Sequence, residues 1–315
     1  MSKGFGAIGF VLLAATSFAA FEPRTAAERA AALGDLSPVP AELRALLGPD
    51  DDFGLIPLPR ENDWLAIHVE PGQTFDEFAH SAANRPNLKR HILYFLPLGD
   101  FADSATPRME TIRRYTEIYF QMEARVLPAY VPDTMEFEPR VNPTTKRVQW
   151  LTRKIEKFLE TRLPDDAYCL LGVTMQDLYP KASWNYVFGE ATLLDRVGVY
   201  SFARFDPDFF DEERPRDFRQ TILRRCCKVL SHETGHMFGM KHCIYYDCVL
   251  NGSNGLSETD LRSVELCPVC LRKLQFSTGF DAVKRYRELA KFYRREHWNE
   301  DAEWCERQLA KVKAR

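Results

Sequence analysis

Residues 231–242 read Ser-His-Glu-Thr-Gly-His-Met-Phe-Gly-Met-Lys-His. Residues four apart on a helix lie about 40° apart around its axis, so His232 and His236 project from one face. Two imidazoles arranged in this way can bind one zinc ion at roughly 2.0–2.1 Å each. Glu233 stands beside the first histidine, where its carboxylate can take a proton from a zinc-activated water that attacks a carbonyl. The stretch therefore predicts a catalytic zinc on a long helix, which we place at residues 221–238.

The end of this helix supplies a third ligand. His242 cannot lie on the same helix face, so the chain must turn sharply after residue 238, and Gly239 permits the left-handed conformation that such a turn requires. His242 can then complete a set of three protein ligands and leave the fourth position open, which is typical of a catalytic zinc. Two histidines and a glutamate occur by chance in many helices, but the added glycine and third histidine make coincidence a poor explanation.

The chain has eight cysteines, and four of them cluster just after the histidine motif. They are Cys243, Cys248, Cys267 and Cys270, and the Cys267-Pro268-Val269-Cys270 stretch has zinc-knuckle spacing. This clustering favours metal binding over disulfides, although disulfides would gain support if the protein were exported. Cys169, Cys226 and Cys227 lie in apolar stretches and are expected to be buried.

Composition limits the class of partner. Of the 315 residues, 45% are hydrophobic and 28% charged, and the formal net charge is −3. Such a balance gives no reason to expect nucleic-acid binding. Residues 6–21 form an uncharged apolar run behind Lys3, shorter than the roughly 20 residues of a membrane span. The run fits a secretory signal, but an apolar helix or a start codon assigned too far upstream are alternatives. The weak basic region favours a cytoplasmic protein, whereas a cleaved signal would mean secretion.

Apolar runs and helical periodicity predict alternating strands and helices before residue 221. Strands are predicted at 88–98, 124–131, 167–174 and 198–205, the second as an edge strand because of Pro128. Helices are predicted at 106–122 and 149–163, with a polar loop at 137–147. This order indicates an α/β sheet. A charged amphipathic stretch at 281–313 ends the chain.

The extended histidine motif resembles the metzincin clan, and together with the cysteines that follow it resembles the archaemetzincin (archaelysin) family of metallopeptidases. Further stretches are similar to the same family: DLYP at 177–180, WNYVFGEA at 184–191, VGVYSFARF at 197–205 and LCPVCLRKLQ at 266–275. The resemblance spans about residues 21–291.

The resemblance implies an α/β (α+β) metzincin-like zincin fold. Its parts are a twisted, mostly parallel sheet with an antiparallel edge strand, a long active-site helix and a small cysteine-zinc C-terminal subdomain. We accordingly divide the chain into an apolar segment at 1–20, an N-terminal zincin subdomain at 21–242 and a C-terminal subdomain at 243–315. The family likeness also implies two zinc ions per chain, with the four clustered cysteines holding a structural one. Neighbours in an extended segment point opposite ways, so His242 and Cys243 can serve one metal each.

The likeness also suggests where substrate binds and where this chain differs. In metzincins an edge strand above the cleft pairs with an extended peptide, and the matching segment here is 184–191, an ordinary loop being the alternative. Its expected substrate-binding residues are Asn185, Tyr186, Val187, Phe188 and Gly189. The family has a methionine under the catalytic zinc, the Met-turn, where this chain has Leu250. Because leucine and methionine are similar in volume, we expect altered packing and not a dead enzyme.

These features predict a zinc-dependent metallopeptidase, acting as a monomer on peptide or protein substrates, with Glu233 as general base. Two alternatives stay open: a zinc-stabilised module that only binds peptides, and a zinc hydrolase of a non-peptide amide. A pure binder has no need of a carboxylate at position 233, so Glu233 discriminates between a peptidase and a peptide-binding module. Endopeptidase and aminopeptidase action are not separated by the sequence.

Overall fold

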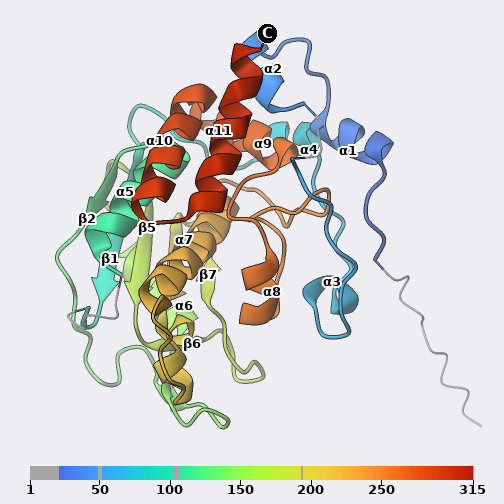
Figure 1. The fold of residues 1–315 in the computed structure, drawn as a ribbon. Coiled ribbons are helices and arrows are strands. Elements are labelled where there is room, and N and C mark those ends of the chain that lie inside the picture. The colour runs from blue at the N-terminus through green and yellow to red at the C-terminus, as the bar shows by residue number, and fades with distance from the viewer. Residues whose placement is uncertain (1–20, 49–51, 102–106, 193, 315) are drawn as a thin grey trace, which may run out of the picture.

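The computed structural model describes residues 21–48, 52–101, 107–192 and 194–314. Its centre is a five-stranded sheet in the order β2-β1-β5-β8-β7, in which β7 alone runs antiparallel, at one edge (Figure 1). The strands are β1 (Ile92–Leu98), β2 (Ala124–Val126), β5 (Ala167–Thr174), β7 (Gly189–Ala191) and β8 (Val197–Ser201). The predicted α/β class, with a mostly parallel sheet and an antiparallel edge strand, is confirmed.

Helices cover both faces of the sheet, which is why β1 and β5 are continuous apolar runs. Along β1, Leu93 and Phe95 pack with α5 (Met109–Phe120) and α7 (Phe218–Met237) in the larger core. Their neighbours Tyr94 and Leu96 face the other way, toward α6 (Thr152–Glu160). The long helix predicted at 221–238 is α7, and it packs against β7 and β8 (Figure 1).

Several sequence predictions of local structure were wrong in part. Of the strand predicted at 124–131, only Ala124–Val126 is strand. Residues 149–151 were predicted as helix but belong to β4 (Val148–Leu151), and α6 begins only at Thr152. β4 pairs with β3 (Arg140–Val141), inside the predicted loop, and with β6 (Asp177–Tyr179) in a second, three-stranded sheet. This pairing with distant residues outweighs local helical periodicity. The strand predicted at 198–205 ends at Ser201, and two short 3₁₀ helices follow, η1 (Ala203–Phe205) and η2 (Pro207–Phe210).

The remaining helices come from both ends of the chain, and most of them pack together. They are α1 (Ala26–Leu33), α2 (Ala41–Leu46), α3 (Trp64–Ile67), α4 (Phe75–Ala79), α8 (Leu256–Leu261), α9 (Pro268–Thr278), α10 (Ala282–Arg295) and α11 (Asn299–Lys313). Helices α1 and α4 contact α9, while α2 contacts α10 and α11 (Figure 1). The sheet is thus flanked by a layer built from both termini, and the boundary at 242/243 stays a prediction.

The apolar N-terminal segment at 1–20 lies outside the described residues. Within the described part of the chain, no helix combines the length and apolar character needed to cross a membrane.

Candidate metal centres and substrate cleft

Three histidines meet at the C-terminal end of α7. One ring nitrogen of each of His232, His236 and His242 lies within 4.8 Å of the others, and the Nε2 atoms of the first two are 3.0 Å apart. Gly239 makes the turn between helix and third histidine, with φ of +81°. A Cβ at this position would also collide with the side chain of Ala83. The predicted need for glycine therefore has two physical causes, backbone conformation and close approach.

Each histidine is oriented through its other ring nitrogen. Nδ1 of His232 lies 2.8 Å from the Val249 carbonyl oxygen, and Nδ1 of His236 lies 2.7 Å from that of Met240. Nδ1 of His242 lies 2.7 Å from Oε1 of Glu70. With these partners Nδ1 donates, and every Nε2 keeps a free lone pair directed at the common centre. Such outer partners are what metal-binding histidines require.

The surroundings also keep these imidazoles in the form that binds metals. Burial, followed by the charges of His236 and His242, holds the pKa of His232 well below its usual value. Burial and then His242 lower the pKa of His236 to about 4. Neutral imidazole is the ligand form, and three nitrogen donors with an open side suit a catalytic zinc. The donor set therefore fits the metal that the sequence predicts.

Glu233 lies beside this trio and faces the edge strand. A Cβ added to Gly189 of β7 would lie 3.1 Å from Cγ of Glu233, so the strand approaches α7 as closely as a glycine allows. Burial raises the pKa of Glu233 to about 8, and the carboxylates of Glu190 and Glu156 add to the shift. A carboxyl group whose pKa is raised by burial therefore stands next to the first histidine.

The four clustered cysteines form a second centre in the interior. The Sγ atoms of Cys243, Cys248, Cys267 and Cys270 all lie within 4.8 Å of one another, and all four residues are buried. None of the eight cysteines forms a disulfide. The backbone amides of Leu250 and Cys267 point at Sγ of Cys248, at 3.5 and 3.4 Å.

The electrostatics of this centre favour a thiolate. Burial opposes ionisation of Cys243, but hydrogen bonds from the other three cysteines bring its pKa well below the usual range. Four sulfur donors around one point are the set that closes the shell of a structural zinc. Cys169, Cys226 and Cys227 are buried as predicted, and so is Cys305.

The two centres share one turn of chain. His242 contributes to the first and its neighbour Cys243 to the second. Leu250 packs against α7 close to both centres: it is fully buried, and its Cδ2 lies 3.0 Å from where a Cβ on Gly235 would stand. Its carbonyl oxygen accepts the Cys243 amide at 2.8 Å. The side chain thus fills the space under the helix turn that carries His232 and His236.

A cleft of about 660 Å³ opens in front of the histidines. Its lining includes Glu233, the three histidines and all five residues predicted to bind substrate, Asn185, Tyr186, Val187, Phe188 and Gly189. Only Gly189 belongs to β7, while Val187 makes an isolated antiparallel bridge to Leu178. The segment therefore forms a rim of the cleft that is strand at one end and irregular at the other.

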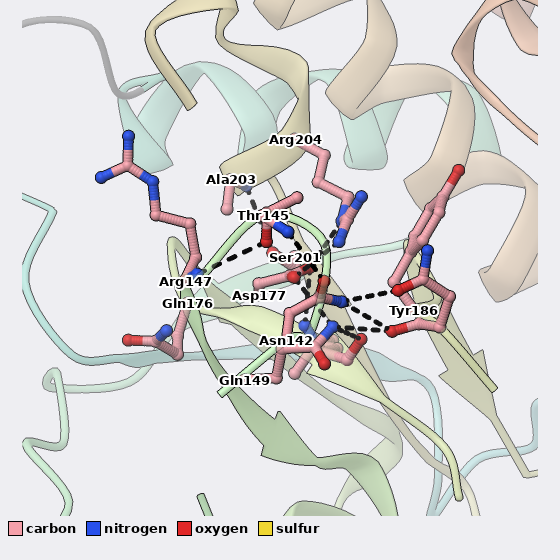
Figure 2. A network of polar contacts seen from close by, with 12 residues as sticks. Asn142, Thr145, Arg147, Gln149, Gln176, Asp177, Tyr186, Ser201, Ala203 and Arg204 are labelled. Carbon is pink, nitrogen blue, oxygen red and sulfur yellow. Dashed lines mark hydrogen bonds and ion pairs between the residues drawn. The ribbon is translucent and has the colours of Figure 1, made fainter. Parts of the chain in front are cut away.

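A polar network that the sequence analysis missed holds this rim in place (Figure 2). Asp177 and Arg204 form a two-point ion pair with N–O distances of 2.7 and 2.8 Å, and their side chains are 0% and 6% exposed. The Arg204 guanidinium lies 3.6 Å from the centroid of the Tyr186 ring. Gln149 joins Asp177 to the Asn185 carbonyl, with hydrogen bonds of 2.8 and 3.0 Å.

The second partner of the rim comes from β3 and the turn after it. Asn142 donates to the backbone and side-chain oxygens of Asn185, and Arg140 donates to the carbonyls of Trp184 and Asn185 (Figure 2 labels Asn142). Charged residues inside apolar stretches, such as Asp177 and Arg204, were the signal in the sequence. Their pairing was hidden because it depends on the second sheet.

Comparisons with known proteins agree with one another. The profile of Peptidase family M54 matches residues 145–276. Archaemetzincin-2 of Rattus norvegicus is 36% identical over 76% of this chain and 74% of its own length. Archaemetzincin-1 of Mus musculus is 31% identical over 72% of this chain and 51% of its own length. Among solved structures, the archaemetzincin of Archaeoglobus fulgidus complexed with malonate is 29% identical, covers 58% of this chain and 99% of that chain, and has a TM-score of 0.45. The chain belongs to the archaemetzincin family of peptidases, and it is a zinc metallopeptidase.

Proposed function

We propose that this protein hydrolyses peptide bonds at the three-histidine centre, with Glu233 as the general base. The observation that carries the proposal is the convergence of three histidine nitrogens and one half-buried carboxyl group on a single cleft. Zinc bound by His232, His236 and His242 would supply a Lewis acid that activates water near neutral pH.

The chain's own part in the chemistry is proton transfer and positioning. Glu233 takes the proton from the attacking water and delivers it to the leaving amine. Burial raises the pKa of Glu233, which makes its ionised form a stronger base, and that form takes the proton. The rim from Asn185 to Gly189 offers its backbone to an extended peptide, an arrangement that carries affinity with little sequence preference. The polar network beneath the rim fixes that backbone before substrate arrives.

We further propose a second zinc on Cys243, Cys248, Cys267 and Cys270, which gives two ions per chain. This ion has no open position for substrate, so its part is to stabilise the fold. Leu250 takes the place of the family's methionine as an apolar support under the histidines. We expect Leu250→Met to change activity little, because the swap nearly conserves volume.

Metal analysis and peptide cleavage test these proposals together. The protein should carry two zinc ions per chain, and replacing His232 and His236 by alanine should leave one. Cleavage of a peptide library should be lost in Glu233→Gln while zinc content stays unchanged. Equal cleavage by Glu233→Gln and the unchanged protein would refute the assigned base. Peptide binding without cleavage by either would favour a zinc-stabilised binding module.

A further inference from the structure

The part of the cleft next to α8 has two buried cations in its wall. Lys228 lies on α7 one turn before His232, about 6 Å along the helix axis, so it flanks the proposed metal on one side. Arg262 follows α8. Both side chains line the cleft, and the two residues are 3% and 6% exposed.

The ammonium group of Lys228 donates hydrogen bonds to the end of α8, but these do not use all of its protons. Its Nζ donates to the carbonyl oxygens of Thr259 at 2.8 Å and Asp260 at 3.2 Å. An ammonium group has three protons, and these two acceptors use two of them. Burial, followed by the nearby charge of Arg224, lowers the pKa of Lys228 to about 8. An anion placed beside it would favour the charged form of Lys228 and could accept the remaining proton.

Arg262 supplies a second donor without an acceptor. One end of its guanidinium donates from Nη2 to Oε1 of Glu258 at 3.1 Å. Its Nε atom is buried and has no hydrogen-bond partner among the described residues. Buried polar groups normally find a partner, so an unpaired guanidinium nitrogen in the wall of a cleft points to an acceptor that is supplied by a ligand.

The neighbouring carboxylates are already engaged. Glu258 accepts the backbone amides of Trp64, at the start of α3, and of Asn254, and it also accepts from Arg262. Asp260 is held at two points by Arg225, at 3.0 and 2.6 Å. Asp247 accepts a backbone amide at 3.0 Å. These three acids are each bound to other donors and leave the third proton of Lys228 and Nε of Arg262 available.

We call the part of the cleft between Lys228 and Arg262 the recess. We propose that the recess binds a carboxylate of the substrate, so that the enzyme prefers peptides with an acidic residue or a free C-terminus close to the scissile bond. The inference rests on the proposed peptidase function and adds a substrate class to it. A carboxylate has the charge and the two acceptor oxygens that the pair of donors requires. Val229, also in the cleft wall, offers apolar contact to the methylene groups of a glutamate.

Paired peptides test the preference. Each pair carries Glu or Gln at one position near the cleaved bond, and a second series carries a free or an amidated C-terminus. We expect kcat/KM to be about tenfold higher, or more, for the acidic member at one position, since a charge-assisted hydrogen bond is involved. A larger ratio in the first series identifies a side chain as the source of the carboxylate, and a larger ratio in the second identifies the C-terminus. Ratios near one throughout both series would overturn the proposal.

Variants assign the preference to the recess. Lys228→Met should bring the acidic-to-neutral ratio close to one, and Lys228→Arg should keep the ratio. Because the two peptides are compared within one variant, a general loss of activity cancels in the ratio. Arg262→Met gives a second, independent loss of a donor. Lys284→Met, an exposed lysine of α10, is the matched control and should change nothing. A ratio that persists in both methionine variants of the recess would place the preference elsewhere and contradict the inference.

A binding measurement separates this inference from the catalytic proposal. Fluorescent Glu and Gln peptides are titrated into the Glu233→Gln protein, and their Kd values are compared by anisotropy. A Kd about tenfold lower for the acidic peptide, abolished by adding Lys228→Met, supports the recess even if no peptide is cleaved. Equal Kd values for the two peptides, together with normal cleavage by the unchanged protein, would refute carboxylate binding in the recess and leave the peptidase function supported.

Discussion

At the scale of single residues, the site depends on groups that fix the histidines from outside. Glu70 is the one charged partner among them: its Oε1 accepts from both His242, at 2.7 Å, and the Trp64 indole, at 2.8 Å. The ring of Trp64 also packs edge-on against His242, with centroids 5.1 Å apart. Glu70 therefore orients His242, the one histidine of the trio that does not lie on α7.

Replacing Glu70 by glutamine should weaken zinc binding at the histidine centre. Loss of a charged outer partner typically costs 10–100-fold in metal affinity, and we expect a loss in that range. Competition with a chelator measures it, while the zinc on the cysteines stays bound. Glu42→Gln, an exposed acid on α2, is the control. Unchanged zinc affinity in Glu70→Gln would mean that Glu70 does not position His242.

Glu156 on α6 gives a pH-dependent prediction. Burial and the charge of Glu190 raise the pKa of Glu156 to about 7, from an ordinary value of 4.5. The folded protein then holds a proton that the unfolded chain releases, so stability falls as pH rises from about 4.5 through 7. Glu156→Gln removes this loss and should raise the free energy of unfolding by up to about 3 kcal/mol at pH 8, with little effect at pH 4.5.

Thermal unfolding at several pH values tests this, with Glu160→Gln as the control on the exposed face of the same helix. A stability difference between Glu156→Gln and the unchanged protein that does not grow with pH would contradict the assigned cause.

At the scale of elements, the second sheet supports the cleft rim. β4 and β6 bring Gln149 and Asp177 into register, and η1 brings Arg204 beneath Tyr186 (Figure 2). The rim residues have little regular structure of their own. Their position above Glu233 therefore depends on this buried network and on the short β7 strand.

Removing the Asp177–Arg204 ion pair of the polar network should destabilise the protein and make the cleft rim less well ordered. Asp177→Asn leaves the Arg204 guanidinium buried without its counter-ion, which typically costs 3–5 kcal/mol. Urea unfolding measures the loss, and KM should rise for any peptide still cleaved. The matched control is Asp211→Asn, which removes the exposed pair with Arg147 and should cost no more than about 1 kcal/mol. Equal losses in the two variants would show that the buried pair has no special role.

At the scale of the whole molecule, the cysteine centre joins the two ends of the chain to the active-site helix. Cys243 and Cys248 follow α7 directly, while Cys267 and Cys270 begin α9. Helix α9 in turn packs on α1 and α4 (Figure 1). A metal at this point therefore ties the sheet region to the terminal layer.

Removing the cysteine-bound zinc should lower Tm more than emptying the histidine site. We expect Cys270→Ser to lose that zinc and to unfold at a clearly lower temperature, because metal binding contributes to folding free energy. The protein with His232 and His236 replaced should keep a Tm close to normal. Cys305→Ser, another buried cysteine but outside the cluster, is the control for the substitution itself. Similar Tm values for Cys270→Ser and Cys305→Ser would argue against a structural zinc.

The sequence by itself determined the fold class, the family and which histidines and cysteines lie together, because ligand spacing on a helix and a CxxC turn are local geometry. Strand β5 was predicted with the bounds that it has, since a buried parallel strand is a continuous apolar run. Only the tertiary structure decided β4, the Glu70 partner of His242 and the recess between Lys228 and Arg262. These depend on residues far apart in the chain, 172 positions in the case of Glu70 and His242, and no local pattern reports such pairing.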